Sequence, residues 1–255
     1  MATYKKRGAK KSQTQVEGRV DMPESTTAEV FETLDTSASK AEAVISKYQN
    51  LIIIVVSIVA VGVLSYLGYD RFVVVPKHQE AVSELNQAQY YFDLAVNSIE
   101  GDSLFTRALN GGEGKYGFLD IIENYKGTPA AKLATYSAGM AYLNLKEYDK
   151  AINYLDQFQT DDILLSALSQ GAIGDAFAQI DQKNEAFEYY VNAAEVSENL
   201  FSTPKYLFKA AMIGAEIGKE KQALSFLKRI QKEYPEAPEA ANVAIQIGRL
   251  ETAQR

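Results

Sequence analysis

The feature that most constrains this chain is an uncharged stretch of 22 residues between Lys47 and Asp70. Its centre, from Leu51 to Leu67, contains twelve Leu, Ile or Val side chains. At about -0.4 kcal/mol for each in mid-bilayer, these contribute about -5 kcal/mol to insertion. A helix of about 20 residues crosses the hydrocarbon layer, and lipid imposes a helix because every backbone amide must pair within the segment. Residues 48–69 are therefore predicted to form a transmembrane helix.

Two other interpretations of this segment are possible, a buried core helix and a cleaved signal peptide. Cleavage is disfavoured because fifty residues precede the apolar run and no small-x-small site follows it. As a signal anchor, the helix presents an apolar surface to lipid or to the helices of a membrane partner. The side chains expected to make these contacts are Leu51, Ile54, Val55, Ile58, Val61 and Leu64.

Basic residues predict the orientation. A cluster at the N-terminus favours keeping that end in the cytoplasm, and it comprises Lys5, Lys6, Arg7, Lys10 and Lys11. Close to the span the basic count is even, with Lys40 and Lys47 before it and Arg71 and Lys77 after it. We expect a single-pass protein of a bacterial inner membrane with a periplasmic domain at 70–255.

Two short segments precede the span. Residues 1–25 are polar and basic, which predicts a disordered cytoplasmic tail. Residues 26–47 are expected to form a short amphipathic helix, because Thr26 and Glu29 match a capping box and Val30, Phe31 and Leu34 make an apolar face. This helix either lies on the membrane surface or docks a cytoplasmic or membrane partner.

Charge and composition exclude several functions. Residues 51–255 carry eighteen basic against twenty-six acidic side chains, and an acidic surface repels phosphate backbones, so nucleic acid is not an expected partner. The chain has no Cys and one His, His78, which excludes disulfides, thiolate chemistry and multi-His metal sites. We expect no metal and no cofactor.

Apolar periodicity predicts an all-α domain beyond the span. Small and large apolar residues recur at steps of three and four from Ala81 to Ile99, and a short helix follows at 103–109 before a glycine-rich loop. Proline is expected at the first helical position after Thr128, Thr203 and Ala237. Further helices are predicted at 117–125, 130–144, 148–159, 163–180, 184–197, 205–217, 220–233 and 238–252.

A repeat of two helices runs through this domain. Ala151, Ala186 and Ala223 occupy equivalent places in YDKAINYL, NEAFEYYV and KQALSFLK, and twelve residues before each stands Gly139, Gly174 or Ala211. Small residues at this fixed spacing let two helices approach closely where they cross. The pattern is similar to the tetratricopeptide repeat, with units at about 132–165, 167–200 and 204–237 and a capping helix at 238–252. The fold class expected is therefore an α-solenoid.

The resemblance to tetratricopeptide repeats implies a binding surface on the inner, concave face of the stack. The residues that this geometry assigns to it are Tyr136, Met140, Leu143, Asn144, Gly171, Asp175, Gln179, Phe208, Met212 and Glu216. This lining is aromatic and Met-containing with few charges, which suits adaptable contacts to apolar surfaces of partner proteins.

No catalytic constellation is expected. The adjacent Asp161 and Asp162 stand at a helix start, where carboxylates usually act as caps. Asn110–Gly114 is glycine-rich but lacks the Lys-Ser/Thr of a phosphate loop. We therefore expect a chain that is not an enzyme.

The layout of short basic tail, single span, long helix and acidic repeat domain resembles the YfgM-type ancillary subunits of the bacterial SecYEG translocon. The resemblance implies a periplasmic chaperone or adaptor beside the export channel. Its implied partners are the translocon and a membrane-anchored prolyl-isomerase-like chaperone. The alternative is a scaffold subunit of another envelope secretion or assembly machine.

Overall fold

The structure is a computed structural model that describes residues 26–99, 101–196 and 198–253. Helices joined by short loops and turns make up these ranges, which contain no strand; the one β-like feature there is an isolated bridge between Gly112 and Lys115. The predicted all-α class is therefore confirmed. The chain divides between Tyr66 and Leu67 into two compact units, which are described separately. The predicted disordered tail at 1–25 lies outside the described residues.

Helix α1, Thr26–Tyr69, is a single helix of 44 residues. The most apolar 18-residue stretch of this helix has a mean hydropathy of 2.7, and none of its residues is buried. Among the described residues it is the one helix long and apolar enough to cross a membrane, a property that signal sequences share. No helix break separates the segment at 26–47 from the apolar segment, so what we expected as two helices is one.

A π-helical turn, η1 at Asp70–Val74, follows α1. The backbone N–H of Val75 donates to the carbonyl of Asp70, five residues back. Pro76 stands in the first turn of the next helix and has no N–H to donate. A proline ring also crowds the carbonyl four residues earlier, and a widened turn before it relieves that contact.

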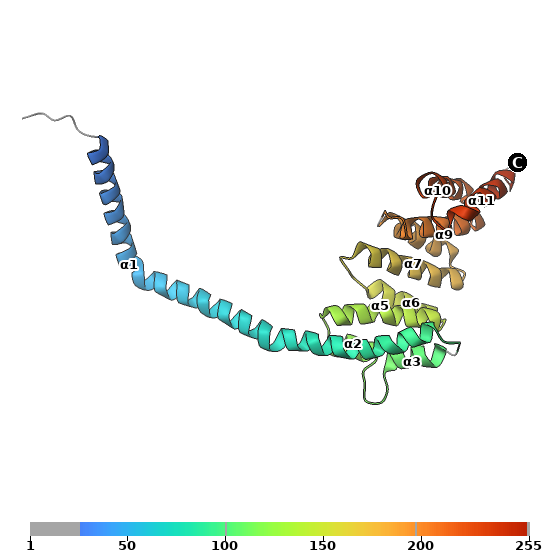
Figure 1. The fold of residues 1–255 in the computed structure, drawn as a ribbon, viewed down its shortest axis with the longest axis horizontal. Helices are drawn as coiled ribbons and strands as arrows, with labels where there is room; N and C mark the ends of the chain where they lie inside the picture. Colours follow the sequence, from blue (N-terminus) through green and yellow to red (C-terminus); the bar gives the residue numbers. More distant parts are fainter. Residues whose placement is uncertain (1–25, 100, 197, 254–255) are drawn as a thin grey trace, which may run out of the picture. The chain divides into compact units, whose positions relative to one another are not determined.

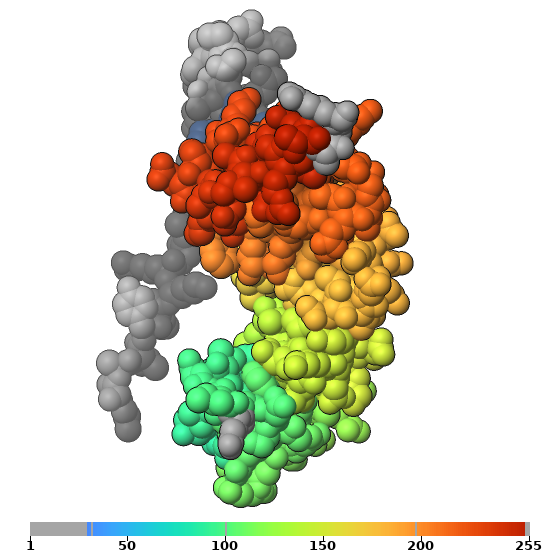
Figure 2. Space-filling model, turned by 90° about the vertical axis from the view of Figure 1, so that its right-hand side faces the viewer, coloured from blue at the N-terminus to red at the C-terminus, as the bar shows by residue number. Residues whose placement is uncertain are grey.

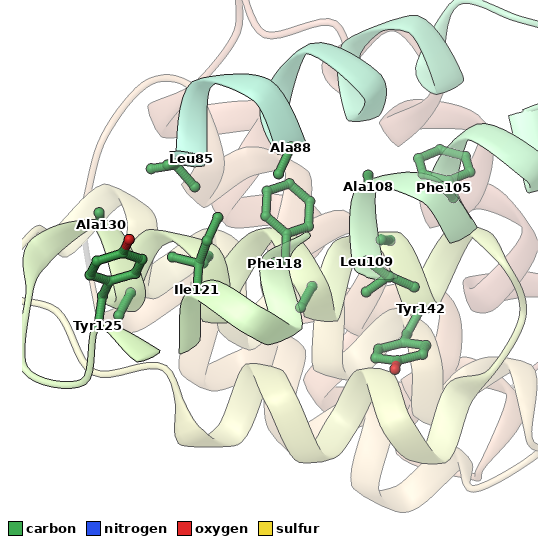
Figure 3. Close-up of a cluster of buried hydrophobic side chains, with 14 of the residues drawn as sticks. Leu85, Ala88, Phe105, Ala108, Leu109, Phe118, Ile121, Tyr125, Ala130 and Tyr142 are labelled. Carbon is green, nitrogen blue, oxygen red and sulfur yellow. The ribbon is translucent and has the colours of Figure 1, made fainter. Parts of the chain in front are cut away.

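Helices α2 (Val75–Val96), α3 (Gly101–Asn110) and α4 (Phe118–Asn124) pack together against the start of the following hairpin. Figure 3 shows Leu85 and Ala88 of α2 facing Phe118 and Ile121 of α4. Phe118 and Ile121 are fully buried. Ile99 was expected on the packed face of α2 but is completely exposed, because α2 ends at Val96.

The rest of the chain forms helices α5 to α11, and every predicted helix is present within a few residues of its expected bounds. They are α5 (Pro129–Asn144), α6 (Tyr148–Gln157), α7 (Ile163–Gln179), α8 (Lys183–Glu195), α9 (Ser202–Glu216), α10 (Glu220–Glu233) and α11 (Ala240–Ala253). Pro129 opens α5 as predicted. The same prediction was wrong for Pro204, the third residue of α9, and for Pro238, which precedes α11.

Consecutive helices from α5 to α10 lie side by side as antiparallel pairs stacked in chain order (Figure 1). Figure 2 shows the same order, from the α2–α4 region through to α11, along the surface of this unit. The turn between α5 and α6 and the end of α7 lie together, since the Tyr148 hydroxyl reaches Gln179 at 3.5 Å. Tyr206 lies over Gly171 and Lys209 binds Asp175, so α9 runs parallel to α7.

Helix α2 also runs parallel to α5. Ser137, in the middle of α5, donates to Gln89 in the middle of α2 at 3.4 Å. Burial of Tyr125 and the neighbouring Glu80 carboxylate near the start of α2 raise the pKa of Tyr125 to about 12. Tyr125 is the C-cap of α4 and lies four residues before Pro129, the first residue of α5. Helices α2, α5, α7 and α9 therefore begin at one end of the stack, which we call the proximal end; the opposite end is the distal end.

Small residues stand where the helices of each pair cross. A Cβ added at Gly139 would lie 2.6 Å from Cγ of Leu155, and one at Gly174 would lie 2.7 Å from Cε1 of Tyr190. The expected packing role of the small residues is confirmed by burial, since Ala151, Ala186, Ala211 and Ala223 are fully buried. Bulkier side chains at these places would push the paired helices apart.

Candidate partner-binding surface

A hollow of about 520 Å³ opens beside the distal turns of the two central helix pairs. Four residues predicted for the concave face meet in it, namely Leu143 and Asn144 from the end of α5 and Asp175 and Gln179 from α7. The hollow is completed by Lys146, Tyr148, Ala178, Tyr190 and Lys209. These residues are far apart in the sequence, and they come together because α5, α7 and α9 stack on one another.

A polar network centred on Asp175 joins three helices in this hollow. The Tyr190 hydroxyl of α8 donates to Oδ1 of Asp175 at 2.6 Å, and the Lys209 ammonium of α9 donates to the same oxygen at 2.5 Å. The Lys209 nitrogen also lies 5.4 Å from the centroid of the Tyr190 ring. Because α7, α8 and α9 each contribute one group, the network ties two successive helix pairs together.

Tyr190 remains a hydrogen-bond donor over the physiological pH range. Burial of its ring raises the pKa of the hydroxyl well above its ordinary value, and the Asp175 carboxylate beside it raises the pKa further. The neighbouring Tyr206 ring stacks on Tyr190 with centroids 6.4 Å apart, and burial raises the pKa of Tyr206 as well. The two rings form a neutral aromatic layer beside the charged pair.

The edge of the hollow carries exposed amides. Asn144 donates from Nδ2 to the carbonyl of Met140 at 2.8 Å, which fixes the direction of its side chain. Gln179 accepts from the Tyr148 hydroxyl through Oε1. Amide side chains both donate and accept hydrogen bonds, and Leu143 adds a half-buried apolar surface beside them. This mixture suits an extended polypeptide, whose backbone offers both donors and acceptors.

The other predicted face residues do not line this hollow. Tyr136 and Met140 are half-buried against the cluster around Leu155 and Ile173, and burial raises the pKa of Tyr136. Phe208 is half-buried in the next cluster. Met212 and Glu216 line a second hollow of about 260 Å³ with Ala215 and the α11 residues Gln246, Arg249 and Leu250. Gly171 is covered by the Tyr206 ring.

The hollow is also more charged than the sequence predicted. We expected a lining of aromatic and methionine side chains with few charges, whereas Lys146, Asp175 and Lys209 all line it. Lys209 was not predicted as a site residue, because the sequence shows only that it follows Phe208 and does not show that its side chain reaches the hollow. Tyr190 was not among the predicted site residues, yet its hydroxyl belongs to the polar network.

The residues predicted to contact a membrane lie along α1 and are all exposed: Leu51, Ile54, Val55, Ile58, Val61 and Leu64. Exposing this apolar surface of α1 to water would cost a large amount of free energy. Its apolar side chains therefore require lipid or another apolar partner.

The described residues form no cluster of candidate metal ligands. Within them, no group of three or more His, Asp or Glu side chains converges as a metal site would require. Asp162 has the capping role expected of it, since its Oδ1 accepts from the backbone N–H groups of Leu164 and Leu165. In the glycine-rich segment, Asn110 ends α3, and a turn at 112–115 is closed by the bridge between Gly112 and Lys115.

Compared with protein-family models and with curated protein sequences, the chain has no significant match to either. The class that its own features define is that of an all-helical protein with one N-terminal helix apolar enough to span a membrane.

Proposed function

We propose that this chain is a membrane-anchored interaction module of tetratricopeptide-like construction that is not an enzyme. Three antiparallel helix pairs, α5/α6, α7/α8 and α9/α10, correspond to the predicted units at 132–165, 167–200 and 204–237. Close contacts at Gly139 and Gly174 support the likeness, because small residues at helix crossings are the feature on which the resemblance rests.

The observation that carries the proposed binding function is the convergence of Leu143, Asn144, Asp175 and Gln179 in one hollow. Asn144 and Gln179 come from equivalent places on successive pairs, 35 residues apart in the sequence, so an extended segment lying along the stack would meet two amide side chains in turn. The Asp175 network holds the base of the hollow in place, which reduces the ordering cost of binding.

The proposed mechanism is tethering. With residues 48–69 in an inner membrane and 70–255 in the periplasm, a weak binding surface is held at high effective concentration near a membrane-bound partner. The orientation follows from the N-terminal basic cluster Lys5, Lys6, Arg7, Lys10 and Lys11. Tethering thus allows avidity to compensate for modest affinity.

The particular role that we propose is that of a periplasmic chaperone or adaptor at the SecYEG translocon. It would act there together with a membrane-anchored prolyl-isomerase-like chaperone. This assignment rests on the resemblance of the layout to YfgM-type subunits.

The test is site-specific photocrosslinking in intact cells. A photoreactive residue replaces Gln179 in the hollow, and the matched control replaces Asn153, which is exposed on α6 and does not line it. We expect crosslinks from position 179 to translocon subunits, to the isomerase-like chaperone or to exported polypeptides, and none of these from position 153.

Two results would contradict the proposal. Equal crosslinking from positions 179 and 153 would show that the hollow is not the binding surface. Crosslinks from 179 to components of a different envelope machine would replace the translocon role with that of a scaffold subunit. Exchange of residues 48–69 for an unrelated transmembrane helix distinguishes the same alternatives. A translocon subunit should then associate less with the channel, whereas a scaffold subunit should keep its function.

A further inference from the structure

The first part of α1 carries apolar side chains at a regular spacing. Between Phe31 and Tyr48 they recur at alternating steps of three and four residues, which places them on one face of the helix. We call this face the seam, and its residues are Phe31, Leu34, Ala38, Ala41, Ile45 and Tyr48. Alternating steps of three and four are the spacing by which two helices pack along each other in a coiled coil.

All six side chains of the seam are exposed. The exposed fraction is 66% for Phe31 and 59% for Ile45. The opposite face of the same stretch is chiefly polar, with Thr36, Ser39 and Lys40 exposed on it. Because removal of apolar side chains from water is favourable, the seam is a surface suited to an apolar partner.

Lipid does not account for the seam. If residues 48–69 cross the bilayer, the seam up to Ile45 lies outside the hydrocarbon layer. Helices that lie flat in the headgroup layer typically carry an excess of Lys and Arg on their polar face, and the anionic cytoplasmic leaflet attracts such residues. Residues 30–48 carry two basic and three acidic side chains and lack that excess. The partner expected for the seam is therefore another helix.

We propose that the seam pairs with the seam of a second copy of this chain in a parallel two-helix coiled coil. Each seam residue then meets the same residue of the other copy. Ala38 and Ala41 in the middle let the two backbones approach closely, and larger apolar side chains close the seam at both ends. A pair of copies also carries two of the proposed binding hollows, which adds to the avidity of a tethered surface.

This inference rests on the proposed membrane anchoring. The seam covers about 27 Å at 1.5 Å per residue, which is short for helices that must meet in solution. Two copies anchored in one bilayer have α1 in the same direction and at a high local concentration. Anchoring therefore removes much of the entropy cost of association.

The charges beside the seam favour the parallel arrangement. Asp35 and Glu42 each directly follow a seam residue, at the heptad position called e. In a parallel pair this position faces position g of the other helix, and the g positions hold the uncharged Val30, Ser37 and Val44. In an antiparallel pair e faces e, which would bring Asp35 of one copy near Glu42 of the other. Like charges repel each other there, so the antiparallel pair is disfavoured.

The absence of cysteine from the chain allows a direct test. Three full-length variants, Ala38→Cys, Ala41→Cys and Ala43→Cys, are reconstituted separately in phosphatidylcholine vesicles and oxidised. All three alanines are exposed, but Ala43 lies on the face opposite the seam. We expect disulfide-linked dimers to form several-fold faster at positions 38 and 41 than at 43, because a disulfide requires Cα atoms within about 7 Å of each other.

A second pair of substitutions tests the seam itself. Ile45→Asp, combined with Ala41→Cys, places a carboxylate of each copy inside the seam and should lower the rate of disulfide formation to that of the Ala43→Cys variant. Ser46→Asp, combined with Ala41→Cys, adds the same charge on the outer face and should leave the rate unchanged. Far-UV circular dichroism verifies that the helices of every variant are intact.

Other results overturn the inference in distinguishable ways. Equal rates at positions 38, 41 and 43 would indicate random collisions in the membrane. No disulfide at 38 or 41, in a chain that floats with the vesicles on a density gradient, would keep the anchor and remove the pairing. A chain that does not float with the vesicles would remove the anchoring itself. In native membranes, a crosslink from position 41 to a protein of different mass, in place of the dimer, would assign the seam to that protein.

Discussion

At the residue scale, close approach of helices depends on glycines that have no space for a side chain. A Cβ at Gly171 would lie 2.0 Å from Cε1 and 2.1 Å from Cζ of Tyr206. Tyr206 is itself almost fully buried and stacks on Tyr190, so its ring cannot move aside without disturbing the Asp175 network. Gly248 on α11 is the opposite case, since a Cβ there would meet nothing within 4 Å.

These two glycines give a matched prediction. We expect Gly171→Ala to lower the free energy of unfolding by about 1–3 kcal/mol, because overpacking forces the ring to shift. Gly248→Ala should raise it by about 1 kcal/mol, since alanine favours an exposed helix interior. Thermal unfolding of the detergent-solubilised chain, followed by circular dichroism, measures both. Equal effects of the two substitutions would contradict the close contact at Gly171.

At the element scale, the first turn of α7 depends on one side chain. Asp162 accepts two backbone hydrogen bonds through the same oxygen, from Leu164 at 2.9 Å and from Leu165 at 3.0 Å. The neighbouring Asp161 is an exposed acid without a capping role, because the cap position is occupied by Asp162. The two adjacent residues carry the same carboxylate group, but only Asp162 caps the helix.

Substitution of these acids tests the cap. Asp162→Ala should destabilise the chain by about 1 kcal/mol, since two N–H groups of the helix lose their acceptor. Asp161→Ala should have almost no effect, and Asp162→Asn should retain most of the stability because asparagine is also a good cap. The three variants are compared by their midpoints of denaturant-induced unfolding, which report stability when the dependence of the unfolding free energy on denaturant concentration is unchanged. A larger loss for Asp161→Ala than for Asp162→Ala would refute the assignment.

At the scale of the whole molecule, the chain consists of an exposed apolar helix and a helical stack with its own core. The core of the stack is formed by buried clusters that run from Ala81 to Val243. Each helix pair buries its apolar face on its neighbours, so the stack should fold cooperatively. The apolar part of α1 has no buried residue, and it contributes nothing to that core.

We therefore expect residues 70–255, produced alone, to be soluble and helical and to melt in one transition. The full chain should remain in the membrane fraction after extraction with alkaline carbonate, because its apolar helix would hold it there. Circular dichroism and fractionation measure the two properties. Aggregation of the fragment, or release of the full chain by carbonate, would contradict this division of roles.

Much of the fold was predictable from the sequence because its signals are local. Apolar periodicity predicted the helices from α2 to α11, and the long uncharged run predicted an apolar helix before them. Local signals failed where a boundary depended on context: Pro204 and Pro238 do not open their helices, and Ile99 is exposed because α2 ends first.

The candidate site was predictable only in part, because its position depends on how helix pairs stack. The resemblance to tetratricopeptide repeats was enough to propose Leu143, Asn144, Asp175 and Gln179, of which Asn144 and Gln179 occupy the same place on successive pairs. It did not reveal that Tyr136 and Phe208 would be half-buried by neighbouring helices, or that Lys209 would reach Asp175 from the next pair. Such contacts join residues more than thirty positions apart, so only the tertiary structure decided them. The apolar helix and the paired-helix pattern, by contrast, were determined by neighbouring residues alone.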